Sequence, residues 1–445
     1  MPACSTRFYI VFLLSFIAFS SKGQSMQDLE SAARAGDTTV QLKLANAYFD
    51  YHDNLNYSTA FSWFQEAAKQ NSPYATYCIG MMYENGLGVG KSFDQAFLWY
   101  TKAANMGQPN AAAALGMLYE NGNGAKQDYN LAMQWYKKAA AKHNADAMAN
   151  IGAMYQDGAG VKRNYEEAMK WYLQAAEQNN GFALCNIGIM YRDGLGVPQD
   201  YAVAIKCFRS SAREGYAYAQ LCMGYMYSDG LGVDTDFKAA VSWFEAAAEG
   251  DNVDAKNNLG YMYFNGFGVK KNYKEALYWY REAAEQGSVS GQSNLGMMYY
   301  NGDGVKKDHV EALNWFTKAA ANDDLMSYDK LGVMYYQADV VGQDYAKAVK
   351  YFREAAEQGY AVAEYHIGMA YYDGKGVARN MDVAINWLYK SAEQGYALAE
   401  TKLGILLYEG KEVAKDIPAG TKFLKQAAGA GIQEAIDYIG ANKIE

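Results

Sequence analysis

The chain has 445 residues, a formal net charge of −9 and an aromatic content of 15%. A balance of 40 lysines and arginines against 49 aspartates and glutamates argues against binding to nucleic acid or to an anionic membrane surface. The four histidines occupy unrelated places in the sequence and show no metal-ligand or catalytic-triad spacing, so we expect no metal, no cofactor and no enzymatic activity.

Residues 1–23 are predicted to be a secretory signal peptide. Arg7 precedes an apolar run from Phe8 to Phe19, and small polar residues follow it, as in exported proteins. The run is too short to span a bilayer comfortably, although an uncleaved anchor is the alternative interpretation. We therefore expect an exported protein with no transmembrane anchor after signal cleavage.

The remainder of the chain is predicted to be a repeat array with a cap at each end. Residues 24–37 are predicted to form an N-terminal capping helix, and residues 432–445 a C-terminal capping helix, because the end units of a solenoid are atypical. The array between them covers residues 38–431 and contains no Pro-rich or Ser-rich linker. We predict one continuous domain, although the length alone suggests two or three.

The array is defined by a glycine, here called the marker glycine, that recurs every thirty-six residues without insertion or deletion. It stands at Gly80, Gly116, Gly152, Gly188, Gly224, Gly260, Gly296, Gly332, Gly368, Gly404 and Gly440. So strict a period indicates a solenoid in which copies of one small unit stack on their neighbours.

Each unit is predicted to contain two helices, helix A and helix B. Around the marker glycine Gly260, the residues Ala255, Leu259 and Tyr263 recur at helical spacing and form an apolar stripe for helix A. The glycine is expected where a second helix approaches closely. A Gly-x-Gly turn follows, and Ser, Asp or Asn stands twelve residues after the marker glycine as the N-cap of helix B.

Helix B is predicted to end at Gly, Asn, Asp or His, residue types that tolerate the left-handed conformation. All eight tryptophans of the chain fall at one position of helix B, here called the tryptophan position. Since a bulky apolar residue repeated in register is typical of packed helices, these tryptophans are predicted to belong to the core.

The combination of Leu-Gly-x-Met-Tyr, Gly-x-Gly-Val, Asp or Asn, Ala, Trp-Tyr and Ala-Ala in a 36-residue frame resembles the Sel-1-like repeats, relatives of the tetratricopeptide repeats. The resemblance covers roughly residues 38–443. It implies an all-α fold, a right-handed α/α superhelix of about eleven helix-turn-helix repeats, that serves as an adaptor or scaffold and usually has no catalytic activity. It implies no particular partner.

The candidate ligand site lies four residues after the marker glycine, at what we call the +4 position. This position is polar in the first half of the array and aromatic in the second half, where it carries Phe264, Tyr300, Tyr336, Tyr372 and Tyr408. Because this position points roughly away from the apolar stripe of helix A, we predict that these five rings form a ladder along a ligand groove. The alternative is that each ring only covers the turn that follows it.

The predicted function is that of an exported scaffold or adaptor that binds a protein or an extended peptide along a concave groove. A periplasmic or secreted bacterial protein is favoured, with the lumen of the secretory pathway as the location if the source is eukaryotic. The alternative is a cell-envelope protein that binds or hydrolyses glycans, because a ladder of aromatic rings can also stack on sugar faces.

Overall fold

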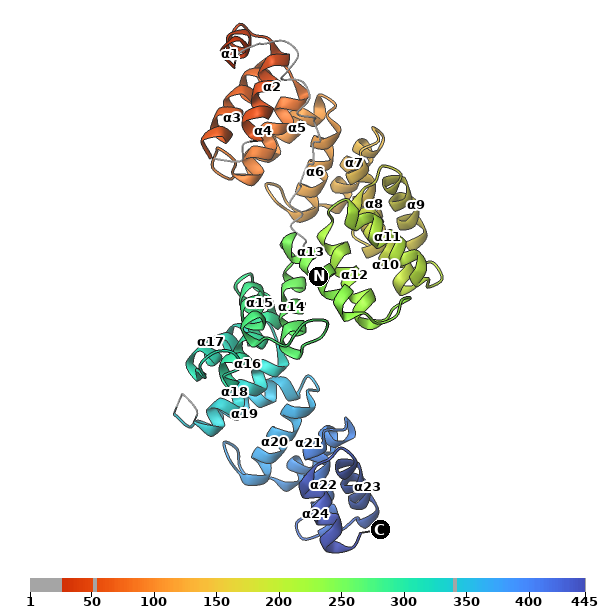
Figure 1. Ribbon diagram of the computed structural model, residues 1–445, viewed down its shortest axis with the longest axis vertical. Coiled ribbons are helices and arrows are strands. Elements are labelled where there is room, and N and C mark those ends of the chain that lie inside the picture. Colours follow the sequence, from red (N-terminus) through yellow and green to blue (C-terminus); the bar gives the residue numbers. More distant parts are fainter. Residues whose placement is uncertain (1–25, 51–53, 339–341, 445) are drawn as a thin grey trace. The chain divides into compact units, whose positions relative to one another are not determined.

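The computed structural model describes residues 26–50, 54–338 and 342–444, and within these ranges the chain forms twenty-four helices and no strand (Figure 1). The predicted signal peptide, residues 1–23, lies outside the described residues. The chain comprises two compact units, residues 1–214 and residues 215–445. The 36-residue period of the sequence runs through this division without a break.

Unit 1 contains one single helix followed by helix pairs. Its helices are α1 (Met26–Arg34), α2 (Thr38–Phe49), α3 (Asn54–Lys69), α4 (Pro73–Asn85), α5 (Phe93–Asn105), α6 (Pro109–Asn121), α7 (Tyr129–Ala140), α8 (Ala145–Asp157), α9 (Tyr165–Ala176), α10 (Gly181–Asp193) and α11 (Tyr201–Arg213). Even-numbered helices are the helices A of the repeats, and odd-numbered helices from α3 onwards are the helices B. The single helix α1 packs against α2 and falls within the segment proposed as the N-terminal cap.

Unit 2 continues the same alternation and ends with a single helix. Its helices are α12 (Ala217–Asp229), α13 (Phe237–Glu249), α14 (Val253–Asn265), α15 (Tyr273–Glu285), α16 (Val289–Asn301), α17 (His309–Ala320), α18 (Leu325–Gln337), α19 (Tyr345–Ala356), α20 (Ala361–Asp373), α21 (Met381–Glu393), α22 (Ala397–Glu409), α23 (Ile417–Gly429) and α24 (Gln433–Asn442). The last helix, α24, packs against α22 and α23 and falls within the segment proposed as the C-terminal cap.

The start of helix B is confirmed in every repeat from α5 to α23. The predicted N-cap side chain accepts a hydrogen bond from a backbone amide of the first turn at Ser92, Asp128, Asn164, Asp200, Asp236, Asn272, Asp308, Asp344, Asn380 and Asp416. Asp128, for example, accepts from the amides of Asn130 and Leu131 at 2.9 and 3.0 Å. Each such cap satisfies amides that no helical carbonyl can reach.

The end of helix B is confirmed in the same way. All ten residues predicted to adopt the left-handed conformation have φ between 58° and 90°: Gly107, His143, Asn179, Gly215, Asp251, Gly287, Asp323, Gly359, Gly395 and Gly431. A left-handed residue just after a helix directs the chain away from the helix axis. The residue type at one position therefore predicts the chain reversal between helix B and the helix A of the next repeat.

The marker glycine packs against a buried side chain of helix B in its own repeat, an aromatic ring in most repeats. A Cβ atom built on Gly116 would lie 2.4 Å from Tyr136 Cε1, a separation no side chain can occupy. The facing residue always stands twenty positions after the marker glycine, at what we call the +20 position: Tyr100, Tyr136, Tyr172, Phe208, Phe244, Tyr280, Phe316, Phe352, Leu388 and Leu424. These side chains are at most 3% exposed, so this contact is the centre of each repeat.

The prediction that the tryptophans form the core is only partly right, because every one of them is partly exposed. The fully buried residue is the next one along helix B, which is turned by about 100° toward helix A. Trp135 packs against a cluster that contains Tyr100 of the preceding repeat and Leu115 of its own helix A, and Trp279 packs in the same way against Phe244 of the preceding repeat and Leu259 of its own helix A. The tryptophans therefore join neighbouring repeats.

The second glycine of the Gly-x-Gly turn also joins neighbouring repeats. Gly124 has a φ of 67°, and a Cβ atom on it would lie 2.4 Å from the carbonyl oxygen of Phe93, the first residue of the preceding helix B. A Cβ atom built on Gly268 would likewise lie 2.3 Å from the carbonyl oxygen of Phe237. The position thus requires both a left-handed backbone and the absence of a side chain.

Candidate functional site

The five residues of the predicted ladder lie near the ends of α14, α16, α18, α20 and α22, all within unit 2, and each is partly buried. Three of them pack on the first residue of the helix B that follows. The ring centroids are 5.1 Å apart for Phe264 and Tyr273, 4.8 Å for Tyr300 and His309, and 4.9 Å for Tyr336 and Tyr345. Such contacts are expected if each ring covers the turn that follows it, which is the alternative interpretation. A ligand-binding role for the ladder stays a prediction.

Two of the polar residues at the +4 position have a partner inside their own repeat. Where the +20 position is tyrosine, a polar residue at +4 can accept its hydrogen bond: the Tyr100 hydroxyl donates to Glu84 at 2.5 Å and the Tyr136 hydroxyl donates to Glu120 at 2.6 Å. A buried hydroxyl needs such an acceptor. Burial raises the pKa of both carboxyl groups, and the hydrogen bond from the tyrosine lowers it by a smaller amount.

Where the +20 position is phenylalanine, no acceptor is required and an aromatic ring can cover it. Tyr300 lies 6.4 Å from Phe316 and Tyr336 lies 6.3 Å from Phe352, measured between ring centroids. The prediction that the +4 residues point away from the core is therefore wrong for these residues. The residue types at +4 and +20 do not pair consistently along the chain, since Arg192 stands with Phe208 and Phe264 with Tyr280. The sequence therefore gave no clear signal of these contacts.

Cations approach four of the five ladder rings. The distances from the cationic group to the ring centroid are 5.8 Å for Lys271 and Phe264, 5.7 Å for Lys307 and Tyr300, 5.3 Å for Lys375 and Tyr336, and 3.9 Å for Lys402 and Tyr372. At exposed sites such a contact contributes about 0.5–1 kcal/mol. The fifth ring, Tyr408, meets the edge of Tyr438 at 6.0 Å. A ligand at this surface would meet amines as well as aromatic rings.

A second aromatic group in unit 2, here called the aromatic cluster, was not predicted. It consists of Phe237 at the start of α13, Tyr261 on α14 and Phe267 in the turn after α14. The rings of Phe237 and Phe267 stack at 4.9 Å, and Tyr261 lies 5.8 Å from Phe267. Tyr261 is 50% exposed and Phe237 is 36% exposed. Because its members hold three different repeat positions, a search for recurring residues could not find it.

Helices A of consecutive repeats contact one another directly, as α6 does with α8 and α8 with α10. Polar side chains bridge them: Asn144 donates to Asn110, and Asn180 to Asp146, each at 2.8 Å. In unit 2 the Nδ1 atom of His366 lies 2.6 Å from Oδ1 of the buried Asp329. These contacts fix neighbouring repeats in register.

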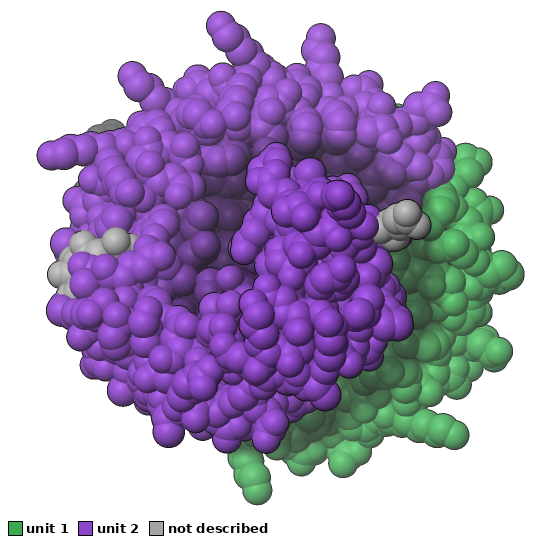
Figure 2. Space-filling view, turned by 90° about the horizontal axis from the view of Figure 1, so that it is seen from below, with its two compact units in different colours: residues 1–214 green, residues 215–445 purple. Residues whose placement is uncertain are grey.

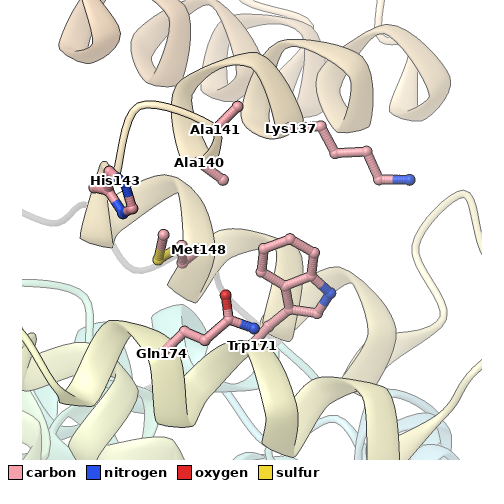
Figure 3. A pocket seen from close by; sticks show the side chains of 7 residues that line it. All are labelled: Lys137, Ala140, Ala141, His143, Met148, Trp171 and Gln174. Atoms are coloured by element: carbon pink, nitrogen blue, oxygen red, sulfur yellow. The ribbon is translucent and has the colours of Figure 1, made fainter.

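Unit 1 contains a pocket of about 350 Å³ between α7, α8 and α9 (Figure 3). Its apolar lining comes from Ala140, Ala141, Met148 and Trp171, and its polar lining from Lys137, His143 and Gln174. Within the described ranges, no group of three or more His, Cys, Asp or Glu side chains is placed to hold a metal ion. In the same ranges none of the helices has the length and apolar character needed to cross a bilayer.

Pairs of antiparallel helices that repeat at a fixed period and pack on their neighbours define an α-solenoid of the tetratricopeptide type. The Sel1 repeat profile matches eleven consecutive segments of the sequence: residues 52–72, 73–108, 109–144, 145–180, 181–216, 217–252, 253–288, 289–324, 326–360, 361–396 and 397–432. The chain therefore belongs to the Sel1 repeat family. This confirms the resemblance, the all-α class and the number of repeats.

Solved structures agree with this assignment. One is c5321, described as a protective antigen present in uropathogenic Escherichia coli strains displaying an SLR fold, with 34% identity, 95% of this chain and 91% of that chain covered, and a TM-score of 0.67. Another is a Sel1 repeat protein from Oxalobacter formigenes, with 29% identity and a TM-score of 0.51. The alignment covers 69% of this chain and 90% of that chain. No curated protein matches the chain.

Proposed function

We propose that this chain is an exported, non-catalytic scaffold that binds a protein partner, or an extended peptide of one, along the helix A side of unit 2. The general role follows from the family, since the chain is a Sel1 repeat scaffold of a kind that generally mediates protein–protein interaction. The choice of binding site is based on the surface of unit 2. In the space-filling view this unit (purple in Figure 2) is hollowed at its centre.

The observation that carries the proposal is the aromatic cluster. Large rings that stay exposed while stacked on one another are held in fixed orientations, so a partner can bury them at little entropic cost. Tyrosines and other aromatic side chains in such positions commonly dominate binding energy. Phe264 of the ladder lies on the same helix as Tyr261, so the ladder could extend the contact surface from the cluster through the later repeats.

The test compares a double variant of the cluster with a single-residue control in binding to peptide and glycan arrays. Tyr261→Ser with Phe267→Ser should lower binding of the retained ligands at least tenfold, because it removes two anchor rings. Tyr278→Ser is the control, since Tyr278 is also 51% exposed but lies on a helix B. Binding that survives the loss of the cluster would refute the proposed surface, and capture of glycans instead of peptides would favour the glycan-binding alternative.

The ladder needs a separate pair of measurements. Tyr300→Ser with Tyr336→Ser removes rings that pack on His309 and Tyr345, so thermal stability and affinity are measured on the same variant. Loss of affinity with little loss of stability would support a binding role. Loss of stability with unchanged affinity of the folded protein would show that the rings only cover their turns.

The proposed export is supported by the apolar segment of residues 8–19 and is compatible with the similarity to a protein described as a protective antigen. Mass spectrometry of the native protein should show a mature N-terminus between Ser21 and Ser25. Recovery of the protein from the cytosol with Met1 intact would contradict export.

A further inference from the structure

We propose that the pocket between α7 and α9 in unit 1 binds an acidic segment of a partner protein, with an apolar side chain of that segment on Trp171 and a carboxylate at Lys137 and His143. This site is separate from the surface proposed in unit 2 and does not depend on it. The floor of the pocket, the charge of its rim and its size all favour such a ligand.

The floor is the indole of Trp171, one of four tryptophans that, among the described residues, have no lysine over the ring. A lysine three residues after the tryptophan position lies over the ring in four repeats, at 5.3 Å for Lys102 and Trp99, 3.8 Å for Lys138 and Trp135, 3.9 Å for Lys318 and Trp315, and 4.2 Å for Lys390 and Trp387. The corresponding residue after Trp171 is Gln174. Within the described part of the chain no lysine or arginine lies over Trp171.

The missing cover opens the indole to the pocket. Gln174 donates from Nε2 to the carbonyl oxygen of Lys170 at 3.3 Å, which keeps its amide against its own helix. Trp171 and Gln174 line the pocket together, so the pocket lies on the side of the indole that lysine covers elsewhere. Figure 3 shows Met148 between these two residues and the end of α7. An apolar side chain can therefore be buried between Trp171 and Met148.

The rim is cationic in a chain that is acidic as a whole. The end of α7 and the turn after it carry Lys137, Lys138, Lys142 and His143, of which Lys137 and His143 line the pocket from opposite sides (Figure 3). Lys138 covers Trp135, and Lys142 donates to the carbonyl oxygen of Gly107 at 2.7 Å. Among the described residues Lys137 makes no ion pair, and the pocket lining includes no aspartate or glutamate.

The corresponding segments of the later repeats mix acidic with basic residues, such as Glu214 with Arg213 and Glu357 with Arg353. Residues 137–143 instead carry three lysines and no acidic residue. A local excess of lysines beside an uncovered aromatic ring selects a partner of complementary charge, by attraction at the pocket and by repulsion from the net negative charge of the chain. The overall charge of −9 opposes a long polyanion such as nucleic acid, whereas one or two carboxylates on a peptide need only the local cations.

The size of the pocket agrees with this occupant. At about 350 Å³ it is at the lower end of the range for ligand pockets, roughly 300–1,000 Å³. It can take one large apolar side chain with the adjoining backbone. The geometry therefore points to a short acidic segment with a single aromatic or large aliphatic residue as its anchor.

The experiment uses the full chain and two fluorescein-labelled peptides, acetyl-EEFEE-amide and its neutral counterpart acetyl-QQFQQ-amide. Fluorescence anisotropy should show saturable binding of the acidic peptide, and binding of the neutral peptide should be at least tenfold weaker. Lys137→Glu should weaken binding of the acidic peptide at least tenfold, because it reverses the rim charge of an exposed residue without disturbing the core. Trp171→Ala should weaken the binding of both peptides.

Matched controls separate the site from general effects. Lys425→Glu makes the same charge change at the same repeat position in unit 2, and Trp315→Ala removes a tryptophan that Lys318 covers; neither should alter peptide binding. A peptide with benzoylphenylalanine in place of phenylalanine should cross-link to α7, α8 or α9, and the cluster variant Tyr261→Ser with Phe267→Ser should bind it normally. No saturable binding up to about 1 mM protein, a Kd that Lys137→Glu leaves unchanged, or cross-links confined to other repeats would overturn the proposal.

Discussion

Replacement of a marker glycine by alanine tests whether the contact between Gly116 and Tyr136 is the centre of the repeat. In Gly116→Ala the new methyl group would lie 2.4 Å from Cε1, 2.5 Å from Cδ1 and 2.9 Å from Cζ of the Tyr136 ring, whereas carbon atoms in contact are about 3.5–4.0 Å apart. The ring must move by roughly 1 Å, and such overpacking costs about 1–3 kcal/mol.

Movement of the ring also disturbs the hydrogen bond of 2.6 Å from Tyr136 to Glu120, and a hydrogen bond to a charged group contributes about 1.5–3 kcal/mol. Against these costs, alanine stabilises a helix interior by about 1 kcal/mol relative to glycine. The expected net destabilisation of the α6–α7 pair is therefore about 2–4 kcal/mol.

Gly368→Ala is the matched comparison at the same repeat position. Its nearest neighbours would be Leu388 Cγ at 3.1 Å and the carbonyl oxygen of Ala384 at 3.3 Å, and the leucine side chain can shift by the few tenths of an ångström required. The gain in helix propensity should nearly balance the cost, so the expected change is within about 1 kcal/mol of zero.

Hydrogen exchange measured by mass spectrometry is the suitable assay, because a long repeat array does not unfold in a single two-state transition. Peptides from α6 and α7 should exchange faster in Gly116→Ala than in the wild-type protein, while peptides from α20 and α21 in Gly368→Ala should change little. Equal effects of the two substitutions, or no effect of Gly116→Ala, would refute the packing argument.

Two further predictions concern pH and the repeat register. Burial raises the carboxyl pKa of Glu84 and Glu120 above the value in the unfolded chain. Between these two pKa values the folded chain binds more protons than the unfolded chain, so the folded state loses stability as the pH rises through this range. Glu84→Gln with Glu120→Gln removes this loss, and its Tm relative to wild type should increase from about pH 4 to about pH 7; a constant or falling difference would contradict burial as the cause. Deletion of residues 217–288, which removes α12 to α15 as two whole periods, should leave a shorter folded array with proportionately less helical circular dichroism, because stability in a solenoid is nearly additive along the repeats. Deletion of residues 217–234 alone should disrupt the array, and the register argument fails if this shorter deletion is the better folded of the two.

Glu84 and Glu120 also show where reasoning from the sequence alone reached its limit. Both hold the same repeat position as the ladder rings, and from the sequence alone they look like exposed polar residues. The hydrogen bonds that they accept from Tyr100 and Tyr136 show that they satisfy buried hydroxyl groups. Glutamine at these two positions keeps an oxygen that can accept the same hydrogen bonds.

The sequence by itself determined the repeat period, the two helices of each unit and the residues at which helix B begins and ends. These features depend on local backbone chemistry: Asp128 can cap the helix that follows it, and Gly107 can adopt a left-handed φ of 86°, whatever surrounds them. The family resemblance followed from the same local pattern.

Only the tertiary structure decided which side chains of each unit are buried and which remain available to a partner. Neighbouring residues of helix B differ by about 100° in direction, so Tyr136 reaches the marker glycine while Trp135 contacts the preceding repeat. The aromatic cluster and the Trp171 pocket arise between elements that are separated in the sequence, and their members hold different repeat positions. A periodic pattern specifies what every repeat shares, whereas these surfaces depend on residues by which one repeat differs from its neighbours and on the packing that brings those residues together.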